Sequence, residues 1–131
     1  MYHQSLKILI ADDEPLMRGL LTSYLAKECR HHIQKCKDGK EAIDLYKLHH
    51  RDIDFVFLDI DMPKLDGLQV LKQMRDINPQ AYVVIISGVG TLKNVKAAID
   101  AGVNGFIAKP YTNCKIGETL DNYLKYKQKA A

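Results

Sequence analysis

Five short strand-like runs, mostly of apolar residues, alternate along this chain with five segments in which apolar residues recur at helical spacing. The runs cover residues 6–11, 31–36, 55–58, 82–86 and 105–108. Runs of this length suit buried strands better than helices. Strands that alternate with helices pair in parallel through right-handed crossovers, with helices on both faces of the sheet. The sequence therefore predicts a five-stranded parallel sheet in a doubly wound (βα)5 sandwich of the α/β class.

Each helical segment carries one apolar face, which we expect to pack against the sheet. The residues expected on these faces are Met17, Leu20, Leu21, Tyr24 and Leu25; Ala42, Ile43, Tyr46 and Leu48; Leu68, Val70, Leu71, Met74 and Ile77; Leu92, Val95, Ala98 and Ile99; and Ile116, Leu120 and Leu124. The run at 31–36 is less apolar than the others, so we expect that strand nearer an edge of the sheet.

The size and composition of the chain fit one globular domain. With 131 residues, of which 47% are hydrophobic and 27% charged, the chain can bury a full core and is not disordered. We expect a single domain over residues 1–131, with a core of about 6–126 and with 127–131 as a tail or the start of a linker. Because no apolar run could span a bilayer and the N-terminus lacks a signal-peptide pattern, we expect a cytoplasmic protein.

Charge, cysteine and histidine usage argue against several kinds of site. The net charge is +3, but the basic residues are scattered and no recognition motif accompanies them, so we expect no direct nucleic-acid binding. The three cysteines, Cys29, Cys36 and Cys114, are odd in number and form no C-x-x-C pair, which argues against a disulfide framework and against zinc. The five histidines lack ligand spacing and are expected at the surface.

Polar and charged residues gather where four of the strands end. Asp12 and Asp13 open a run of three acids after the first strand, Asp59 ends the third, Ser87 follows the fourth and Lys109 follows the fifth. The carboxyl ends of parallel strands share one edge, where open α/β sheets bind their ligands. We therefore expect one crevice that holds three carboxylates, a hydroxyl and an ammonium group.

Two simpler explanations of these acids are weaker. Asp59-Ile60-Asp61 resembles the opening of a calcium-binding loop, but Pro63 and Lys64 stand where that loop requires Asp or Asn and then Gly. Capping of the following helix explains any one of the acids, since carboxylates at helix N-termini are stabilising. It does not explain why acids, a serine and a lysine occupy four strand ends together.

Carboxylates gathered in one crevice repel one another unless a cation holds them ionised. Oxygen ligands with room for water and phosphate suit Mg²⁺, or Mn²⁺, better than zinc. Beside such an ion the carboxylate of Asp59 can act as a nucleophile toward a phosphoryl group. Ser87 can then donate a hydrogen bond to one phosphoryl oxygen, and the ammonium of Lys109 can neutralise another.

These residues resemble the receiver domain of two-component response regulators, in its chemotaxis-type, single-domain form. The resemblance covers residues 6–126 and rests on five separated motifs in the family's order. The motifs are Asp12-Asp13-Glu14-Pro15, Leu58-Asp59-Ile60-Asp61-Met62-Pro63 with Asp66-Gly67, Ser87-Gly88, Ala101-Gly102 and Phe106-Ile107-Ala108-Lys109-Pro110. The resemblance implies the flavodoxin-like form of the doubly wound fold.

The resemblance also implies a Mg²⁺-dependent phosphoacceptor. Asp59 would accept a phosphoryl group from the phosphohistidine of a sensor histidine kinase or a histidine phosphotransfer protein. The protein would catalyse only its own phosphorylation and dephosphorylation, so it would not be an enzyme in the usual sense. Asp13 and Asp59 would bind Mg²⁺ directly, together with the backbone carbonyl of Asp61, while Asp12 would act mainly through water.

The family's switching residues have counterparts here as well. Ser87 would fill the Ser/Thr switch position and Phe106 the aromatic switch position, while Lys109 would contact the phosphoryl group and precede a cis peptide to Pro110. Phosphorylation would switch the surface built from the fourth helix, the fifth strand and the fifth helix, and so control an unknown downstream partner. The resemblance implies no membrane partner.

Three features depart from the family pattern. Asp61 adds a carboxylate at a position that is often uncharged, Gly88 and Gly90 should loosen the loop after the fourth strand, and the net charge is positive. The alternative is a phosphohydrolase resembling the haloacid-dehalogenase superfamily, which also uses an Asp-x-Asp after a buried strand. It is disfavoured because Pro63 stands where that superfamily has Thr or Val, and because its acidic pair follows its lysine.

Overall fold

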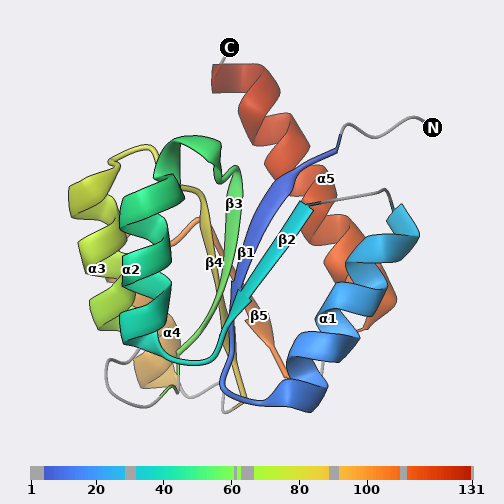
Figure 1. Ribbon diagram of the computed structural model, residues 1–131, viewed down its shortest axis with the longest axis horizontal. Coiled ribbons are helices and arrows are strands. Elements are labelled where there is room, and N and C mark those ends of the chain that lie inside the picture. Colours follow the sequence, from blue (N-terminus) through green and yellow to red (C-terminus); the bar gives the residue numbers. More distant parts are fainter. Residues whose placement is uncertain are drawn as a thin grey trace.

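The computed structural model describes residues 5–28, 32–60, 62, 67–88, 92–109 and 112–130. Its elements, in chain order, are β1 (Lys7–Ala11), α1 (Pro15–Glu28), β2 (His32–Cys36), α2 (Gly39–His49), a 3-10 turn η1 (His50–Asp52), β3 (Phe55–Asp59), α3 (Gly67–Ile77), β4 (Val83–Ser87), α4 (Leu92–Asp100), β5 (Gly105–Ala108) and α5 (Asn113–Ala130). Strands and helices alternate as the sequence predicts (Figure 1).

The five strands form one parallel sheet in the order β2-β1-β3-β4-β5. Every pair of neighbouring strands is parallel, which confirms the predicted doubly wound, flavodoxin-like fold. The edge position of β2 is also confirmed, and its mixed burial reflects its neighbour on one side only. The strand bounds differ from the prediction by single residues: β1 begins at Lys7, and β4 runs from Val83 to Ser87.

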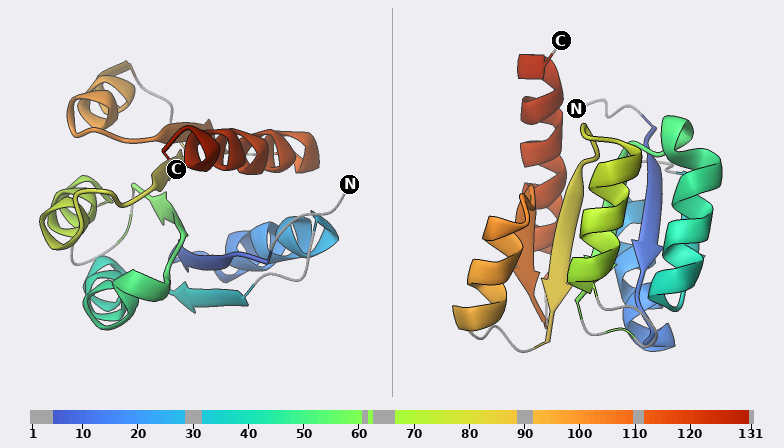
Figure 2. Two further views of the ribbon diagram at one scale, coloured as in Figure 1. Left: turned by 90° about the horizontal axis from the view of Figure 1, so that it is seen from above. Right: turned by 90° about the vertical axis from the view of Figure 1, so that its left-hand side faces the viewer.

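The helices cover both faces of the sheet. α1 and α5 lie on one face, and α2, α3 and α4 lie on the other (Figure 2). Alternate side chains of one strand enter different cores: Ile8 and Ile10 pack with the helices α1 and α5, whereas Leu9 and Ala11 pack with the other three. Both cores are apolar, which explains why the central strands show no alternation of apolar and polar residues.

α2 has a side-chain N-cap, and the turn after α4 is held by a side chain of α3. The side chain of Asp38 accepts a hydrogen bond from the backbone N–H of Glu41 at 2.8 Å, so Asp38 caps α2. Just after α4, Gly102 adopts φ +81°, a conformation that glycine reaches at little cost. The guanidinium of Arg75, in α3, donates to the backbone oxygen of Gly102 and, at 2.8 Å, to the side-chain oxygen of Asn104. These bonds tie α3 to the turn that leads into β5.

Three residues expected on buried helix faces are exposed. Leu20 is 37% exposed, Leu48 is 76% exposed and Ile99 is 63% exposed. The expectation was wrong because each helix contacts the sheet over a narrow stripe, which Leu21 and Leu25 supply in α1. Successive helical residues are rotated by about 100°. Leu48 therefore lies on the side of α2 away from its buried neighbours, and Ile99 is turned out from Ala98.

The last helix reaches the edge of the sheet at which the strands begin. α5 continues past residue 126 without a break to Ala130, and Nζ of Lys127 lies 3.6 Å from Oδ1 of Asp54. The ring of Tyr123 packs at 4.8 Å from that of Tyr82 and at 5.3 Å from that of Phe55, measured between centroids. No helix of the described residues is both long and apolar enough to cross a bilayer.

A carboxylate cluster at the carboxyl ends of the strands

Four of the expected site residues lie at the carboxyl ends of the strands, along one edge of the sheet, which is the lower edge in Figure 1. Asp59 is the last residue of β3 and Ser87 the last of β4. Asp12 directly follows β1, and Lys109 directly follows β5. Asp12, Asp59 and Ser87 are at most 2% exposed, so burial in the sheet fixes where these polar side chains lie.

Four acidic residues form one group at this edge. One carboxylate oxygen each from Asp12, Asp13, Glu14 and Asp59 lies within 4.8 Å of the others. Asp12 and Asp59 are buried, whereas Asp13 and Glu14 are exposed. This is the only group of metal-ligating side chains found among the described residues, and it contains no histidine or cysteine. The expectation that Asp12, Asp13 and Asp59 come together is therefore met.

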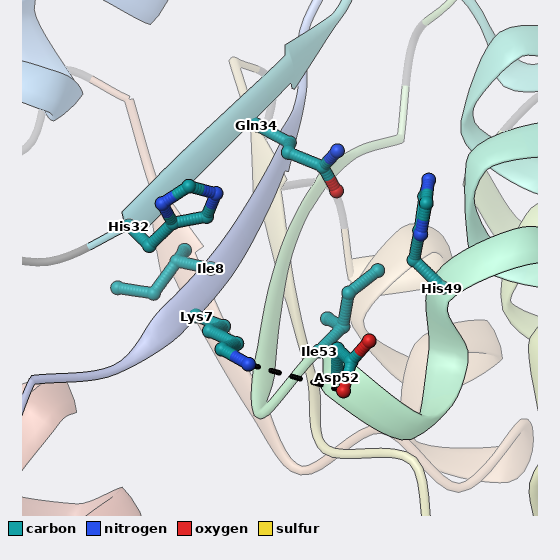
Figure 3. Close-up of a pocket in the computed structure, with 7 residues that line it drawn as sticks. All are labelled: Lys7, Ile8, His32, Gln34, His49, Asp52 and Ile53. Atoms are coloured by element: carbon teal, nitrogen blue, oxygen red, sulfur yellow. Dashed lines mark ion pairs between the residues drawn. The ribbon is translucent and has the colours of Figure 1, made fainter.

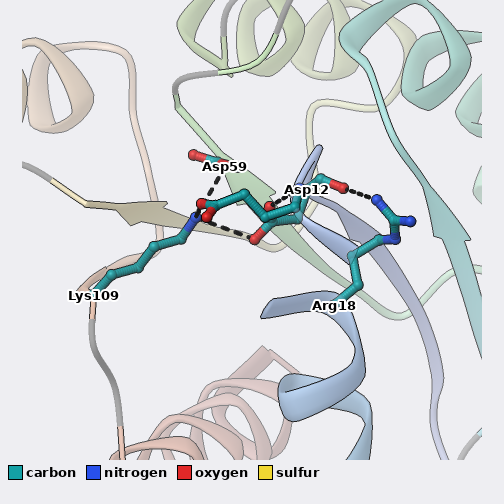
Figure 4. A network of polar contacts seen from close by, with 5 residues as sticks. Asp12, Arg18, Asp59 and Lys109 are labelled. Atoms are coloured by element: carbon teal, nitrogen blue, oxygen red, sulfur yellow. Dashed lines mark hydrogen bonds and ion pairs between the residues drawn. The ribbon is translucent and has the colours of Figure 1, made fainter. Parts of the chain in front are cut away.

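Lys109 reaches into the middle of this group (Figure 4). Its Nζ lies 3.1 Å from Oδ2 of Asp59, 3.2 Å from Oδ2 of Asp12 and 2.9 Å from Oε1 of Glu14. Its side chain is only 10% exposed. Burial lowers the pKa of Lys109, but the hydrogen bond to Glu14 and the charges of Asp59 and Asp12 outweigh that effect and raise it. The lysine is therefore a firmly charged counter-ion for the cluster.

The two carboxylate oxygens of Asp12 have different surroundings. Oδ1 accepts a hydrogen bond from the backbone N–H of Glu14 at 2.9 Å, which closes a local turn just before α1. Oδ2 is buried and accepts no hydrogen bond from the described residues, although the ammonium of Lys109 lies nearby. The backbone oxygen of Asp12 accepts from Arg18 at 2.6 Å (Figure 4). One oxygen thus fixes the turn while the other faces the cluster.

The carboxylates of Asp12 and Asp13 have raised pKa values. For Asp12 the main cause is burial, with the negative charge of Asp59 adding to it, and the hydrogen bond from Glu14 and the charge of Lys109 acting in the opposite direction. For Asp13 burial is again the main cause, followed by the charge of Asp59. Burial and the charge of Asp59 thus outweigh the positive charge of Lys109 at both carboxylates, and a bound cation would act in the same direction as Lys109.

Ser87 and Phe106 lie on the neighbouring strands β4 and β5. Ser87 is fully buried, and its backbone oxygen accepts a hydrogen bond from the N–H of Lys109 at 2.7 Å. Phe106 is half-buried and packs against the core on the side of α2, α3 and α4. The structure thus connects Ser87 to Lys109 through the backbone, which links the ends of β4 and β5.

One contributor to the cluster was not predicted as a site residue, and several predicted residues lie outside the described part of the chain. Glu14 pairs with Lys109, yet its place as the third of three acids suggested only helix capping. Its position two residues after Asp12, at the start of α1, is a signal that could have indicated it. The described residues do not include Asp61, Pro63, Gly90 or Pro110, so the expectations for them stay predictions.

The remaining histidines and cysteines of the described part do not form a second site of this kind. His32 and His49 line a hollow of about 190 Å³ at the opposite edge of the sheet, where Lys7 pairs with Asp52 at 3.8 Å (Figure 3). They belong to no group of metal-ligating side chains among the described residues. Cys36 is buried and Cys114 exposed, and both are free thiols.

Comparison with known proteins identifies the family. The model of the response regulator receiver domain matches residues 8–121. The chemotaxis protein CheY of Bacillus subtilis is 34% identical over 118 residues, which cover 90% of this chain and 97% of that protein. CheY of Thermotoga maritima is 33% identical over 119 residues, covering 91% and 98%.

Solved structures agree with the sequence relatives. A response regulator receiver domain protein from Clostridium thermocellum has a TM-score of 0.88 at 26% identity, and the match covers 96% of this chain and 99% of that one. A chain of the CheX-CheY-BeF3-Mg²⁺ complex from Borrelia burgdorferi has a TM-score of 0.81 at 32% identity, covering 92% and 88%. Sequence, fold and the acidic cluster thus point the same way, and the chain belongs to the response regulator receiver family.

Proposed function

We propose that this protein is a phosphoacceptor of a two-component pathway and that Asp59 receives the phosphoryl group. The observation that carries the proposal is the position of this carboxylate. Asp59 is 2% exposed at the end of β3, grouped with three other carboxylates and 3.1 Å from the ammonium of Lys109. Lys109 offsets negative charge on the reactants directly, and the other carboxylates can hold a cation that does the same, so Asp59 has the surroundings in which a carboxylate can attack a negatively charged phosphoryl group.

The residues of the cluster fit Mg²⁺ or Mn²⁺. The available donors are all carboxylate oxygens, which hard divalent cations prefer, and Oδ2 of Asp12 is buried and accepts no hydrogen bond from the part of the chain that the structure describes. Asp13 and Asp59 would hold the ion directly, with the backbone carbonyl of Asp61, and Asp12 would act mainly through water. When bound, the ion supplies positive charge that offsets the repulsion between the carboxylates and the phosphoryl group.

The chain's own residues then carry out the transfer. A carboxylate oxygen of Asp59 attacks phosphorus, the bond from phosphorus to the donor's imidazole nitrogen breaks, and the imidazole keeps the electron pair of that bond. Lys109 is close enough to Asp59 to neutralise a phosphoryl oxygen on the transferred group. Ser87, at the end of the adjacent strand, would donate its hydroxyl proton to another phosphoryl oxygen.

The output runs through Ser87 and Phe106. When Ser87 turns toward the phosphoryl group, the chain after β4 follows and leaves room for Phe106 to turn inward. Phe106 is half-buried against the core, so part of its ring can still be withdrawn from solvent. One new charge-assisted hydrogen bond would bias this two-state element and change the surface of α4, β5 and α5.

The partners follow from this chemistry. The donor would be a sensor histidine kinase or a histidine phosphotransfer protein in the cytoplasm, and the effector would bind the α4, β5 and α5 surface. We propose no nucleic-acid or membrane partner for this domain. A Borrelia burgdorferi relative forms a complex with CheX that includes BeF3 and Mg²⁺, which supports both a protein partner and a divalent ion.

A phosphohydrolase of the haloacid-dehalogenase type was the alternative. The family match to receiver domains leaves it without support. In that alternative a second aspartate acts as a dedicated acid or base and the phosphate turns over on many substrate molecules. In the proposed function the phosphoryl group stays on Asp59 long enough to signal.

The test is phosphorylation by a small acyl phosphate, followed by mass spectrometry. Wild-type protein with Mg²⁺ should gain one phosphoryl group, and Asp59→Asn should gain none. Asp52→Asn is a matched control, because Asp52 is an exposed aspartate in an ion pair with Lys7 at the opposite edge of the sheet. A gain that persists in Asp59→Asn, or that proceeds equally well in EDTA, would show that Asp59 is not the metal-dependent acceptor.

A further inference from the structure

We propose that Glu14 positions Lys109: it holds the ammonium group when the metal ion engages Asp59 directly and Asp12 through water, and later releases it to the phosphoryl group. This inference rests on the proposed function, because it assigns Glu14 a task in the same site. The sequence motifs and the family resemblance leave that residue without a role.

Lys109 and a metal ion compete for the carboxylates of Asp12 and Asp59. Nζ of Lys109 lies 3.1 Å from Oδ2 of Asp59 and 3.2 Å from Oδ2 of Asp12. The other oxygen of Asp12 is engaged by a backbone N–H, so Oδ2 is the one that faces the crevice. Asp59 must therefore loosen its hold on the ammonium before it can bind a divalent cation directly, and Asp12 before it can bind the ion's water.

Moving Lys109 away from the aspartates has an electrostatic cost. Its side chain is only 10% exposed, and a buried ammonium without a partner is strongly unfavourable. Glu14 removes this cost, because its Oε1 lies 2.9 Å from Nζ, the shortest of the three ion-pair distances. The ammonium can leave both aspartates and still keep a carboxylate partner.

The carboxylates around Lys109 differ in how freely their side chains can move. Asp12 and Asp59 are fixed by burial at strand ends, with side chains 1% and 2% exposed, whereas the side chain of Glu14 is 58% exposed. The backbone of Glu14 is anchored, since its N–H donates to Asp12 at 2.9 Å. Glu14 thus combines a fixed backbone with a side chain that can follow Lys109 outward and let it return.

An exposed ion pair that merely joins the β1–α1 turn to the end of β5 is the simpler explanation. Such a pair stabilises a protein by about 1 kcal/mol at most, with no effect on metal affinity or on phosphorylation. The positioning role predicts changes in both quantities, and in opposite directions. This difference in sign separates the two explanations.

The decisive variant is Glu14→Gln, studied first by calorimetric titration with Mg²⁺ alone. We expect the dissociation constant for Mg²⁺ to rise about three- to tenfold, because one negative charge is lost near the ion and Lys109 stays on the aspartates. Glu14→Asp keeps the charge and should recover part of the affinity. Glu118→Gln is the matched control and should bind Mg²⁺ like wild type, because Glu118 is a similarly exposed glutamate that pairs with Lys115 on α5.

The second measurement is the phosphorylation rate with an acyl phosphate at saturating Mg²⁺. Glu14→Gln should react about two- to fivefold faster than wild type, since Lys109 no longer has to be taken from Glu14 and one charge that repels the donor is gone. Unchanged Mg²⁺ affinity, or a slower reaction at saturating Mg²⁺, would overturn the proposal. The titration needs no phosphorylation, so its result stands even if Asp59 proves not to be the acceptor.

Discussion

The backbone of Gly67 lies directly against that of Asp59. A Cβ atom added to Gly67 would be 2.6 Å from the backbone oxygen of Asp59 and 2.5 Å from Cα of Ile60. The N–H of Gly67 also donates to the backbone oxygen of Ile60 at 3.0 Å. The first residue of α3 is therefore pressed against the end of β3, and only a residue without a side chain fits there.

Gly67→Ala should destabilise the protein by about 2–3 kcal/mol, because backbone atoms cannot move aside as a flexible side chain can. Gly19→Ala is the control in α1, where a Cβ would meet nothing within 4 Å. That change should stabilise the helix by about 0.5–1 kcal/mol. Urea unfolding of both variants measures the difference, and equal stabilities would contradict the close approach at Gly67.

Lys109→Met should make stability depend more strongly on Mg²⁺. Without the ammonium, the buried carboxylates of Asp12 and Asp59 lose their counter-charge, so the melting temperature should fall in EDTA. Saturating Mg²⁺ should then raise the melting temperature by more than it does in wild type, where it stabilises by about 1.4 kcal/mol at ten times the dissociation constant. Thermal unfolding with and without Mg²⁺ gives both values.

Lys40→Met is a suitable control for this experiment. Lys40 also pairs with an aspartate, Asp44 at 3.7 Å, but both side chains are well exposed on α2. Its removal should leave the response to Mg²⁺ at the wild-type value. A response that is the same in all three proteins would mean that Lys109 does not neutralise the metal site.

Cys36 should make the protein less stable in alkali. Burial raises the pKa of this thiol from 9.0 to about 12, and the unfolded chain therefore loses the proton first as the pH rises. The free energy of unfolding should fall above pH 9, by about 1 kcal/mol between pH 8 and pH 10 from this group alone. Urea unfolding of wild type and Cys36→Ala at both pH values isolates the effect.

The comparison depends on the change with pH and not on the absolute stability. Cys36→Ala leaves a small cavity that costs stability equally at both pH values, and it should lose about 1 kcal/mol less than wild type on going to pH 10. Cys114→Ala is the control, since Cys114 is exposed, and it should follow wild type. Parallel losses in wild type and Cys36→Ala would argue against a buried, neutral thiol.

Asp61→Asn should slow the loss of phosphate from Asp59 by a few fold and leave phosphorylation intact. A carboxylate two residues after the acceptor can orient a water molecule for attack on the acyl phosphate, while Lys109 damps its repulsion of the donor. Single-turnover decay of the phosphorylated protein measures this rate. If Asp61→Asn slows this decay by about 100-fold or more, and wild type hydrolyses phosphate esters rapidly, then Asp61 is a dedicated acid or base and the protein is a hydrolase.

The fold could be predicted almost entirely from local pattern. Parallel strands buried on both faces read as apolar runs, so β1, β3 and β4 were found within a residue of their bounds. The buried face of each helix was harder to predict, because an apolar residue one or two positions from the buried stripe cannot be distinguished in the sequence from one within it. Leu48 and Ile99 are exposed for this reason, and only the packing of each helix on the sheet decides it.

The site was predictable where topology alone brings residues together. Asp12, Asp59 and Lys109 meet because parallel strands end at one edge, and this needs no knowledge of side-chain direction. Glu14 could not be assigned in the same way. It lies beyond the strand end, and its pairing with Lys109 depends on the turn before α1, in which the backbone N–H of Glu14 donates to Oδ1 of Asp12.

The contact between Lys109 and Glu14 joins residues 95 positions apart. No fragment that ends before β5 contains both halves of the cluster, and a chain being synthesised exposes the aspartates long before their lysine is made. Because long-range contacts form only after the loops between them have closed, the site is completed late in folding. Only a protein whose whole sheet has assembled could then accept phosphate. An unfinished or partly unfolded copy could not be phosphorylated and so could not signal.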